Sequence, residues 1–273
     1  WMDETYHISW IYEIAQGNTF MGIFENKWLF SFITAMIFSP SGPEGPWLAR
    51  LVNALFGVLS TAACIGAGRL LTRDDRIGLS AGLIYALLPQ AVFHERQALT
   101  DPIMSGFTAA SLLVMIWIAR KPSIRGIIPL AFTLVGAYFG KALALPYLGL
   151  PLVAAIVLAR TRRDRLRALA VAVSGTAVAI GAIQGVYALA RLRGAVPREG
   201  WSPTLDKILL LRMNEPQVLR YFLQDIVNVW DMFWYFYGPA MLLLFIAAVI
   251  LAVRGRWRWE LVFLAIPGLA FIL

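Results

Sequence analysis

The sequence is poor in the residues that soluble domains use for solvation and crosslinking. Charged residues make up 15% of its 273 positions, whereas soluble domains carry about 25%. Because Cys64 is the single cysteine, an intrachain disulfide and a thiolate metal cluster are excluded. The chain has only two histidines, and they do not form a metal-binding signature such as HExxH.

Hydrophobic residues are abundant instead, at 59% of the chain. They form long runs, and a helix needs roughly 20 apolar residues to cross a hydrocarbon core of about 30 Å. The runs therefore predict an all-α polytopic membrane protein. The candidate spans are 48–70, 77–93, 102–119, 124–140, 143–159, 168–190, 239–253 and 260–273. Because no loop follows the last run and no span precedes the first residues, we expect a fragment cut at both ends.

Basic residues gather in the short segments that connect alternate spans. Fourteen of the 24 Lys and Arg residues lie in four such segments: 69–76, 120–125, 160–167 and 254–258. The positive-inside rule makes these loops cytoplasmic. We prefer this interpretation to nucleic-acid or lipid-headgroup recognition.

The outer side then receives the remaining loops and most of the titratable groups. Twelve of the sixteen Asp and Glu residues and both His residues lie there. We expect four parts along the chain: a first outer loop with a juxtamembrane helix (1–47), a transmembrane bundle (48–190) with outer turns at 94–101 and near Lys141, a long outer loop (191–238) and C-terminal spans (239–273).

The first outer loop begins with DETYHISWIYEIAQG at residues 3–17. Its apolar positions have helical spacing, and the predicted helix is too short and polar to span, so we expect it along the membrane surface. Asp3 can cap this helix and Gly17 can end it. Capping explains Asp3 and Glu4 as well as catalysis does, so both interpretations stay open.

The next outer turn, FHERQALTDP at 93–102, holds a second acidic cluster. Thr100 or Asp101 could cap a helix that starts with Pro102. Ionisable groups packed at the end of a membrane bundle are costly and are functional candidates. Among the cations of the outer side, Lys27, Arg50 and Lys141 either snorkel to the headgroups or bind a phosphate.

A family resemblance follows from these segments. DETYHISWIYEIAQG, ENKWLFSFITAMIF and LARLVNALFG resemble the opening of GT-C glycosyltransferases that use polyprenol-phosphate sugars, such as protein O-mannosyltransferases and lipid A aminoarabinose transferases. The resemblance covers roughly residues 1–160. The matching positions are Asp3, Glu4, Tyr6, Ala15, Gly17, Lys27, Arg96, Asp101 and Lys141. Trp28 and Leu29 depart from it, because many members have two prolines there.

The resemblance implies a membrane enzyme that moves a sugar from a polyprenyl-phosphate donor to an acceptor hydroxyl of a lipid, glycan or protein. It implies a bacterial or archaeal plasma membrane with the active site facing outside. The implied catalytic residues are Asp3, the general base, with Glu4 and Asp101. The implied donor-phosphate ligands are Lys27, Arg96 and Lys141.

These residues make no cofactor certain, and a divalent metal stays open. His7, Glu25 and His94 are the residues that could support the site or bind such a metal. Two other classes also stay open, a secondary transporter and a non-catalytic membrane scaffold. A transporter site lies near the bilayer midplane, whereas the acidic residues here lie in loops at one surface, which favours an interfacial enzyme.

Overall fold

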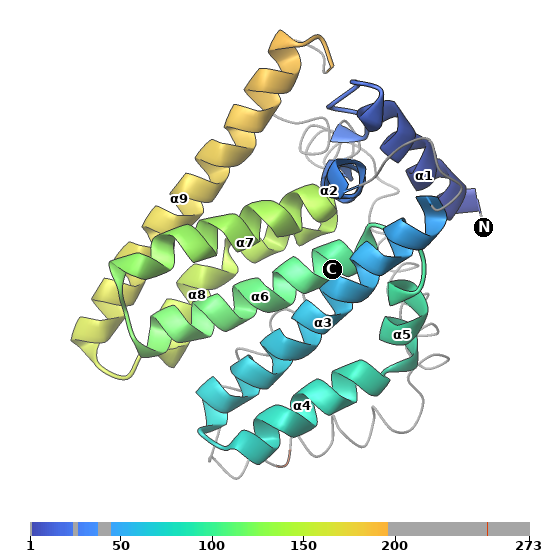
Figure 1. The fold of residues 1–273 in the computed structure, drawn as a ribbon. Helices are drawn as coiled ribbons and strands as arrows, with labels where there is room; N and C mark the ends of the chain where they lie inside the picture. Colours follow the sequence, from blue (N-terminus) through green and yellow to red (C-terminus); the bar gives the residue numbers. More distant parts are fainter. Residues whose placement is uncertain (1, 24–26, 38–44, 196–249, 251–273) are drawn as a thin grey trace, which may run out of the picture.

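The computed structural model describes residues 2–23, 27–37, 45–195 and 250 (Figure 1). Throughout these ranges the regular elements are helices, which confirms the predicted all-α membrane bundle. The α-helices are α1 (Met2–Ala15), α2 (Trp28–Ile37), α3 (Gly45–Thr72), α4 (Asp75–Leu87), α5 (Pro89–Glu95), α6 (Asp101–Arg120), α7 (Ile127–Gly140), α8 (Leu150–Leu158) and α9 (Arg162–Leu192). Two 3₁₀ turns, η2 (Ile124–Gly126) and η3 (Ala142–Leu148), precede α7 and α8.

Parts of the prediction lie outside the described residues. These are the outer loop 191–238 beyond residue 195, the basic segment 254–258, and the spans 239–253 and 260–273 apart from Ile250.

Three described helices, α3, α6 and α9, are long and apolar enough to cross a membrane. In α6, 61% of the apolar window is buried, against 33% in α3 and in α9. The centre of the bundle is therefore α6, which packs against α3, α7, α8 and α9. The outward face of α3 carries exposed apolar residues such as Leu55 and Val58, as a lipid-facing helix requires.

Two of the predicted spans are interrupted. The span 77–93 is divided because α4 ends at Leu87, Leu88 is extended, and Pro89 starts α5. The span 143–159 is divided into η3 and α8, with Pro151 in the first turn of α8. Proline lacks the N–H that would continue a preceding helix and disfavours helical geometry in the residue before it.

The connections sort to the two ends of the bundle. The α3–α4, α6–α7 and α8–α9 connections, which carry the predicted cytoplasmic arginines, share one end (Figure 1). The opposite end holds α1, the turn between α5 and α6, and Lys141 at the end of α7. The acidic loops predicted to share a face therefore share an end of the bundle.

Close helix contacts set the geometry of both ends of the bundle. A Cβ atom on Gly140 would lie 3.0 Å from the backbone of Met104, so the end of α7 touches the start of α6. A Cβ atom on Gly68 would lie 2.9 Å from Cα of Gly78, so α3 and α4 pack backbone to backbone. Small residues allow this approach between membrane helices.

An apolar cluster attaches α1 to the bundle. Its members come from α1, α2, α3, the turn before α6, α6, α7 and η3: Ile11, Phe30, Ala49, Val52, Ala98, Ile103, Met104, Phe107, Ala137 and Ala144. Gly17 follows the end of α1 with φ of 107°, as predicted for a helix-ending glycine. The predicted cap at Asp3 is wrong, because α1 already begins at Met2. Thr100 takes the N-cap position of α6 but makes no side-chain capping bond.

Candidate functional site

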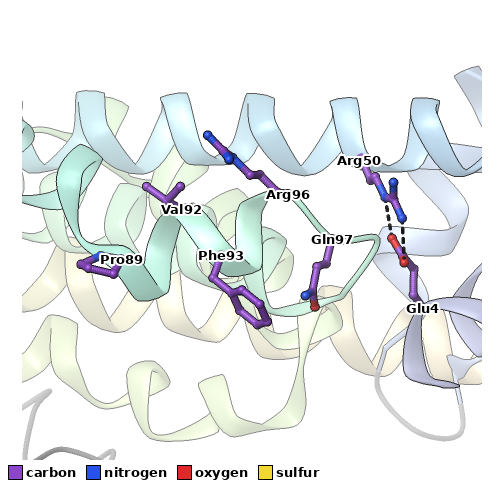
Figure 2. A pocket seen from close by; sticks show the side chains of 7 residues that line it. All are labelled: Glu4, Arg50, Pro89, Val92, Phe93, Arg96 and Gln97. Carbon is purple, nitrogen blue, oxygen red and sulfur yellow. Dashed lines mark hydrogen bonds and ion pairs between the residues drawn. The ribbon is translucent and has the colours of Figure 1, made fainter. Parts of the chain in front are cut away.

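An ion pair joins α1 to α3. Glu4 lies in the first turn of α1 and Arg50 in the second turn of α3. Arg50 Nε donates to Glu4 Oε1 at 2.7 Å, and Arg50 Nη2 donates to Glu4 Oε2 at 2.9 Å (Figure 2). The carboxylate is 8% exposed and the guanidinium 48% exposed. Parallel N–H···O bonds of this kind fix the orientation of both groups.

The same carboxylate also binds the turn between α5 and α6. The backbone N–H of Ala98 donates to Glu4 Oε1 at 3.0 Å. The hydrogen bond from Arg50 lowers the pKa of Glu4 below its ordinary value, burial raises it, and the Ala98 N–H lowers it further. An ionised carboxylate with a lowered pKa is a weak proton acceptor. These contacts favour a positioning role for Glu4 over the predicted catalytic role.

Asn53, one helical turn after Arg50, binds the other side of this turn. Its Nδ2 donates to the carbonyl oxygens of Gln97 and Leu99, the latter at 2.7 Å. Asn53 is not among the functional residues that the sequence predicts. The available signal is an amide inside the apolar run LARLVNALFG, three positions after an arginine.

A second ion pair lies at the head of α6. Lys141 Nζ is 2.7 Å from Asp101 Oδ1, and the two side chains are 26% and 34% exposed. The contact between α6 and α7 at Gly140 brings the two residues together. An ammonium has three donors, so Lys141 can contact a second acceptor while it holds Asp101.

An open hollow of about 510 Å³ lies beside the first ion pair. It is lined by Glu4, Arg50, Pro89, Val92, Phe93, Arg96 and Gln97. Figure 2 shows that the hollow has a charged end, formed by Glu4 and Arg50, and an apolar end, formed by residues of α5. This volume is within the range of small-molecule sites, about 300–1,000 Å³. The lining suits a ligand with an anionic head and an apolar tail.

Two cations line this hollow, Arg50 and Arg96. Arg96 is the one whose charge can bind an anionic ligand without first leaving a carboxylate. Its side chain is exposed, and among the described residues it makes no ion pair, whereas Arg50 holds Glu4 and Lys141 holds Asp101. Its neighbour Glu95 instead packs against α3, where a Cβ atom on Gly57 would overlap the carboxyl group. Burial raises the pKa of Glu95, while a hydrogen bond with Tyr85 opposes that effect.

The other predicted residues whose side chains the structure describes are not among those that line the hollow. His7 is 4% exposed and packs against Trp10 and Phe30, with ring centroids 5.2 and 6.1 Å away. His94 packs edge-on against Phe93 at 5.4 Å, and Lys27 immediately precedes α2. The side chain of Asp3 and all of Glu25 lie outside the described part of the chain. No three His, Cys, Asp or Glu residues group as metal ligands within that part, and the metal stays an open prediction.

The fold and these contacts define an integral membrane protein with a polar, amphipathic site at one end of a helical bundle. A family model described as dolichyl-phosphate-mannose-protein mannosyltransferase matches residues 16–163. This match covers more than half of the 273 residues, and the chain belongs to that family, whose members are membrane glycosyltransferases of the GT-C type. The predicted resemblance is thus confirmed. The matched segment begins after Asp3 and Glu4.

No curated protein and no solved structure matches the chain.

Proposed function

We propose that this protein transfers a sugar from a polyprenyl-phosphate donor to an acceptor hydroxyl, and that the hollow beside α5 holds the donor. The observation that carries the proposal is the exposed guanidinium of Arg96, which forms no ion pair with another described residue, at the rim of a hollow with one apolar wall. Family membership supports the donor class, and mannose is the first sugar to test.

The cations of the hollow suit a phosphate. Arg96 presents a planar fork of donors, the geometry that matches phosphate oxygens. Arg50 uses its Nε and Nη2 on Glu4 and keeps its remaining N–H groups for a ligand. Negative charge develops on the phosphate as the sugar leaves, and positioned donors stabilise that charge. Lys27 and Lys141 remain candidates for further phosphate contacts.

The apolar wall suits the lipid. Pro89, Val92 and Phe93 line the hollow away from the ion pair. The isoprene units next to the phosphate would cover these side chains. The remainder of the tail would enter the bilayer beside the exposed apolar residues of the bundle.

The chemical step needs a proton acceptor. The acceptor oxygen bonds to the anomeric carbon, the bond from that carbon to the phosphate oxygen breaks, and polyprenyl phosphate leaves. The hydroxyl proton passes to a carboxylate, for which Asp3 is the candidate by resemblance. An ordinary Asp, with a pKa of about 3.9, is ionised at neutral pH, and general-base catalysis contributes roughly 10²–10⁴-fold. Asp101 is the alternative base, or it orients Lys141.

Charge distribution supports the orientation. The arginine-rich connections lie at the end of the bundle opposite the hollow. The positive-inside rule then assigns the hollow to the extracytoplasmic face. We retain a bacterial or archaeal plasma membrane as the proposed location.

The test uses the full-length protein in liposomes with radiolabelled polyprenyl-phosphate mannose. We expect Arg96→Ala to lower sugar transfer and polyprenyl-phosphate release by about 10²-fold or more, the usual loss for one stabilising donor. The control is Arg163→Ala, an exposed arginine at the opposite end of the bundle. Equal activity of Arg96→Ala and wild type would remove the proposed donor site. Solute uptake by sealed vesicles without any sugar transfer would support a transporter instead.

A further inference from the structure

We propose that Asn53 is a positioning residue that holds the 97–99 turn and, through it, sets the placement of Arg96 for sugar transfer. The catalytic part of this proposal rests on the proposed function. Its structural part, that Asn53 holds the turn, can be tested without any activity.

The contacts form a continuous clamp. Asn53 Nδ2 binds the carbonyl oxygen of Gln97, Glu4 Oε1 binds the N–H of Ala98, and Asn53 Nδ2 also binds the carbonyl oxygen of Leu99. Three successive residues of the turn are thus held alternately by α3 and α1. Both carbonyl oxygens are acceptors only, so the Asn53 amide must present its nitrogen to them.

Asn53 is an unfavourable residue for its local environment. It lies inside α3 with a relative exposure of 0%, and asparagine is a poorer helix former than the apolar residues around it. Its Oδ1 is buried without a hydrogen-bond partner among the described residues. Leaving a buried acceptor unpaired costs free energy. The helix around position 53 therefore gives no reason for an asparagine there. The two hydrogen bonds from its side chain to the 97–99 turn do give one.

A charged residue lies on each side of the clamped residues 97–99. Arg96 lies immediately before the clamped residues and lines the hollow. Asp101 lies two residues after them and pairs with Lys141. Without Asn53, the carbonyl oxygens of Gln97 and Leu99 lose their side-chain donor. The turn then keeps the hydrogen bond to Glu4 and the apolar packing of Ala98. A displacement of about 1 Å can lower a reaction rate about 10²-fold.

Hydrogen exchange tests the clamp directly. Peptides covering 94–101 would be compared by mass spectrometry for full-length wild type, Asn53→Ala and Thr61→Ala. Thr61 is a matched control, because it also lies on α3 but its hydroxyl bonds within its own helix, to Gly57 O at 3.0 Å. We expect faster exchange at Ala98 and its neighbours only in Asn53→Ala. Unchanged exchange in that variant would overturn the clamp.

A double-mutant cycle tests whether Asn53 acts through Arg96. We expect Asn53→Ala to lower kcat/KM for the polyprenyl-phosphate donor about 10²-fold. In an Arg96→Ala background, the same change should cost less than about threefold, because coupled residues are not additive. Fully additive losses would show that Asn53 acts independently of Arg96 and would overturn its positioning role.

A second variant separates the loss of the donor from the loss of side-chain volume in Asn53→Ala. Asn53→Asp keeps the size of the side chain but replaces the donor with an acceptor that faces two carbonyl oxygens. We expect the same loss of activity and the same faster exchange; wild-type activity in a folded Asn53→Asp protein would contradict the proposal. A wild-type protein with no sugar transfer would defeat the proposed function, while the exchange result would still decide whether Asn53 holds the turn.

Discussion

Glu4 and Arg50 form a two-bond ion pair that joins α1 to α3 across 46 positions of sequence. The same carboxylate accepts the N–H of Ala98, 94 positions away. One side chain thus connects the first outer helix, a membrane-spanning helix and the second outer turn. This relationship yields a prediction about stability and pH.

Replacing Glu4 with Gln should destabilise the protein by roughly 1–3 kcal/mol at neutral pH, the cost of losing a charged hydrogen-bond partner. Because Arg50 lowers the pKa of Glu4 in the folded state, this stabilisation is complete above the ordinary pKa of 4.5. It is lost as the pH falls through the folded-state pKa. Thermal melting in detergent should show a difference in melting temperature between wild type and Glu4→Gln, and this difference should become smaller only in acid. Glu13→Gln, at an exposed position, is the control. A difference between wild type and Glu4→Gln that is the same at every pH would contradict the prediction.

The pair of Asp101 and Lys141 should matter more for activity than for stability. Both side chains are about one-third exposed, and such pairs contribute about 0–1 kcal/mol. We therefore expect Lys141→Met to leave the melting temperature nearly unchanged but to lower sugar transfer strongly. The charge swap Asp101→Lys with Lys141→Asp should restore the pair without restoring transfer. Recovery of transfer by the swap would show that the pair is only structural.

The Glu95 carboxyl group occupies the side-chain space of Gly57. A Cβ atom there would lie 2.2 Å from Glu95 Oε2, so the carboxyl group of Glu95, the neighbour of Arg96, would have to move. Because this group is the end of a flexible side chain, we expect Gly57→Ala to lower transfer more than it lowers the melting temperature. The matched control is Gly185→Ala in α9, where nothing lies within 4 Å of the new atom. Replacing a helical glycine with alanine in open space gains up to about 1 kcal/mol. Equal behaviour of the two variants would contradict the packing of Glu95 on α3.

The apolar wall of the hollow should sense the donor lipid. We expect Phe93→Ala to raise KM for a long-chain polyprenyl-phosphate sugar and to leave KM for an analogue with a methyl group in place of the polyprenyl chain unchanged, because the isoprene units next to the phosphate cover this wall. The control is Phe132→Ala, an exposed aromatic residue on α7 that does not line the hollow. Equal changes in KM for both donors would place the tail elsewhere.

The sequence predicted those features that depend on local pattern. Apolar runs located α3, α6 and α9, and the family followed from short motifs in order along the chain. The interruption of 77–93 was missed because its proline lies within an otherwise apolar run, where hydropathy alone continues the span. The predicted N-cap at Asp3 was wrong because an acidic side chain is also stabilising within the first turn of a helix, so residue type does not fix the first helical residue.

The contacts of the site could not be predicted in the same way. The partners of Glu4 and Asn53 are distant in sequence, and their geometry depends on how α1, α3 and the 97–99 turn pack. Residue type also does not give the packing of a side chain. His7 was predicted from its chemistry as a possible metal ligand, and in the fold its ring packs against Trp10 and Phe30; its metal role stays a prediction. Arg96 and Lys141 were grouped as phosphate ligands, but only the structure shows that Lys141 already holds a carboxylate.

The central claim is that the donor lies in the hollow between α1, α3 and α5. Photocrosslinking tests it most directly, with the full-length protein in liposomes and a polyprenyl phosphate that carries a diazirine on its first isoprene unit. Mass spectrometry should find the label on residues 89–97, and Arg96→Ala should abolish it while Arg163→Ala retains it. Labelling confined to other helices, unaffected by Arg96→Ala, would contradict the account.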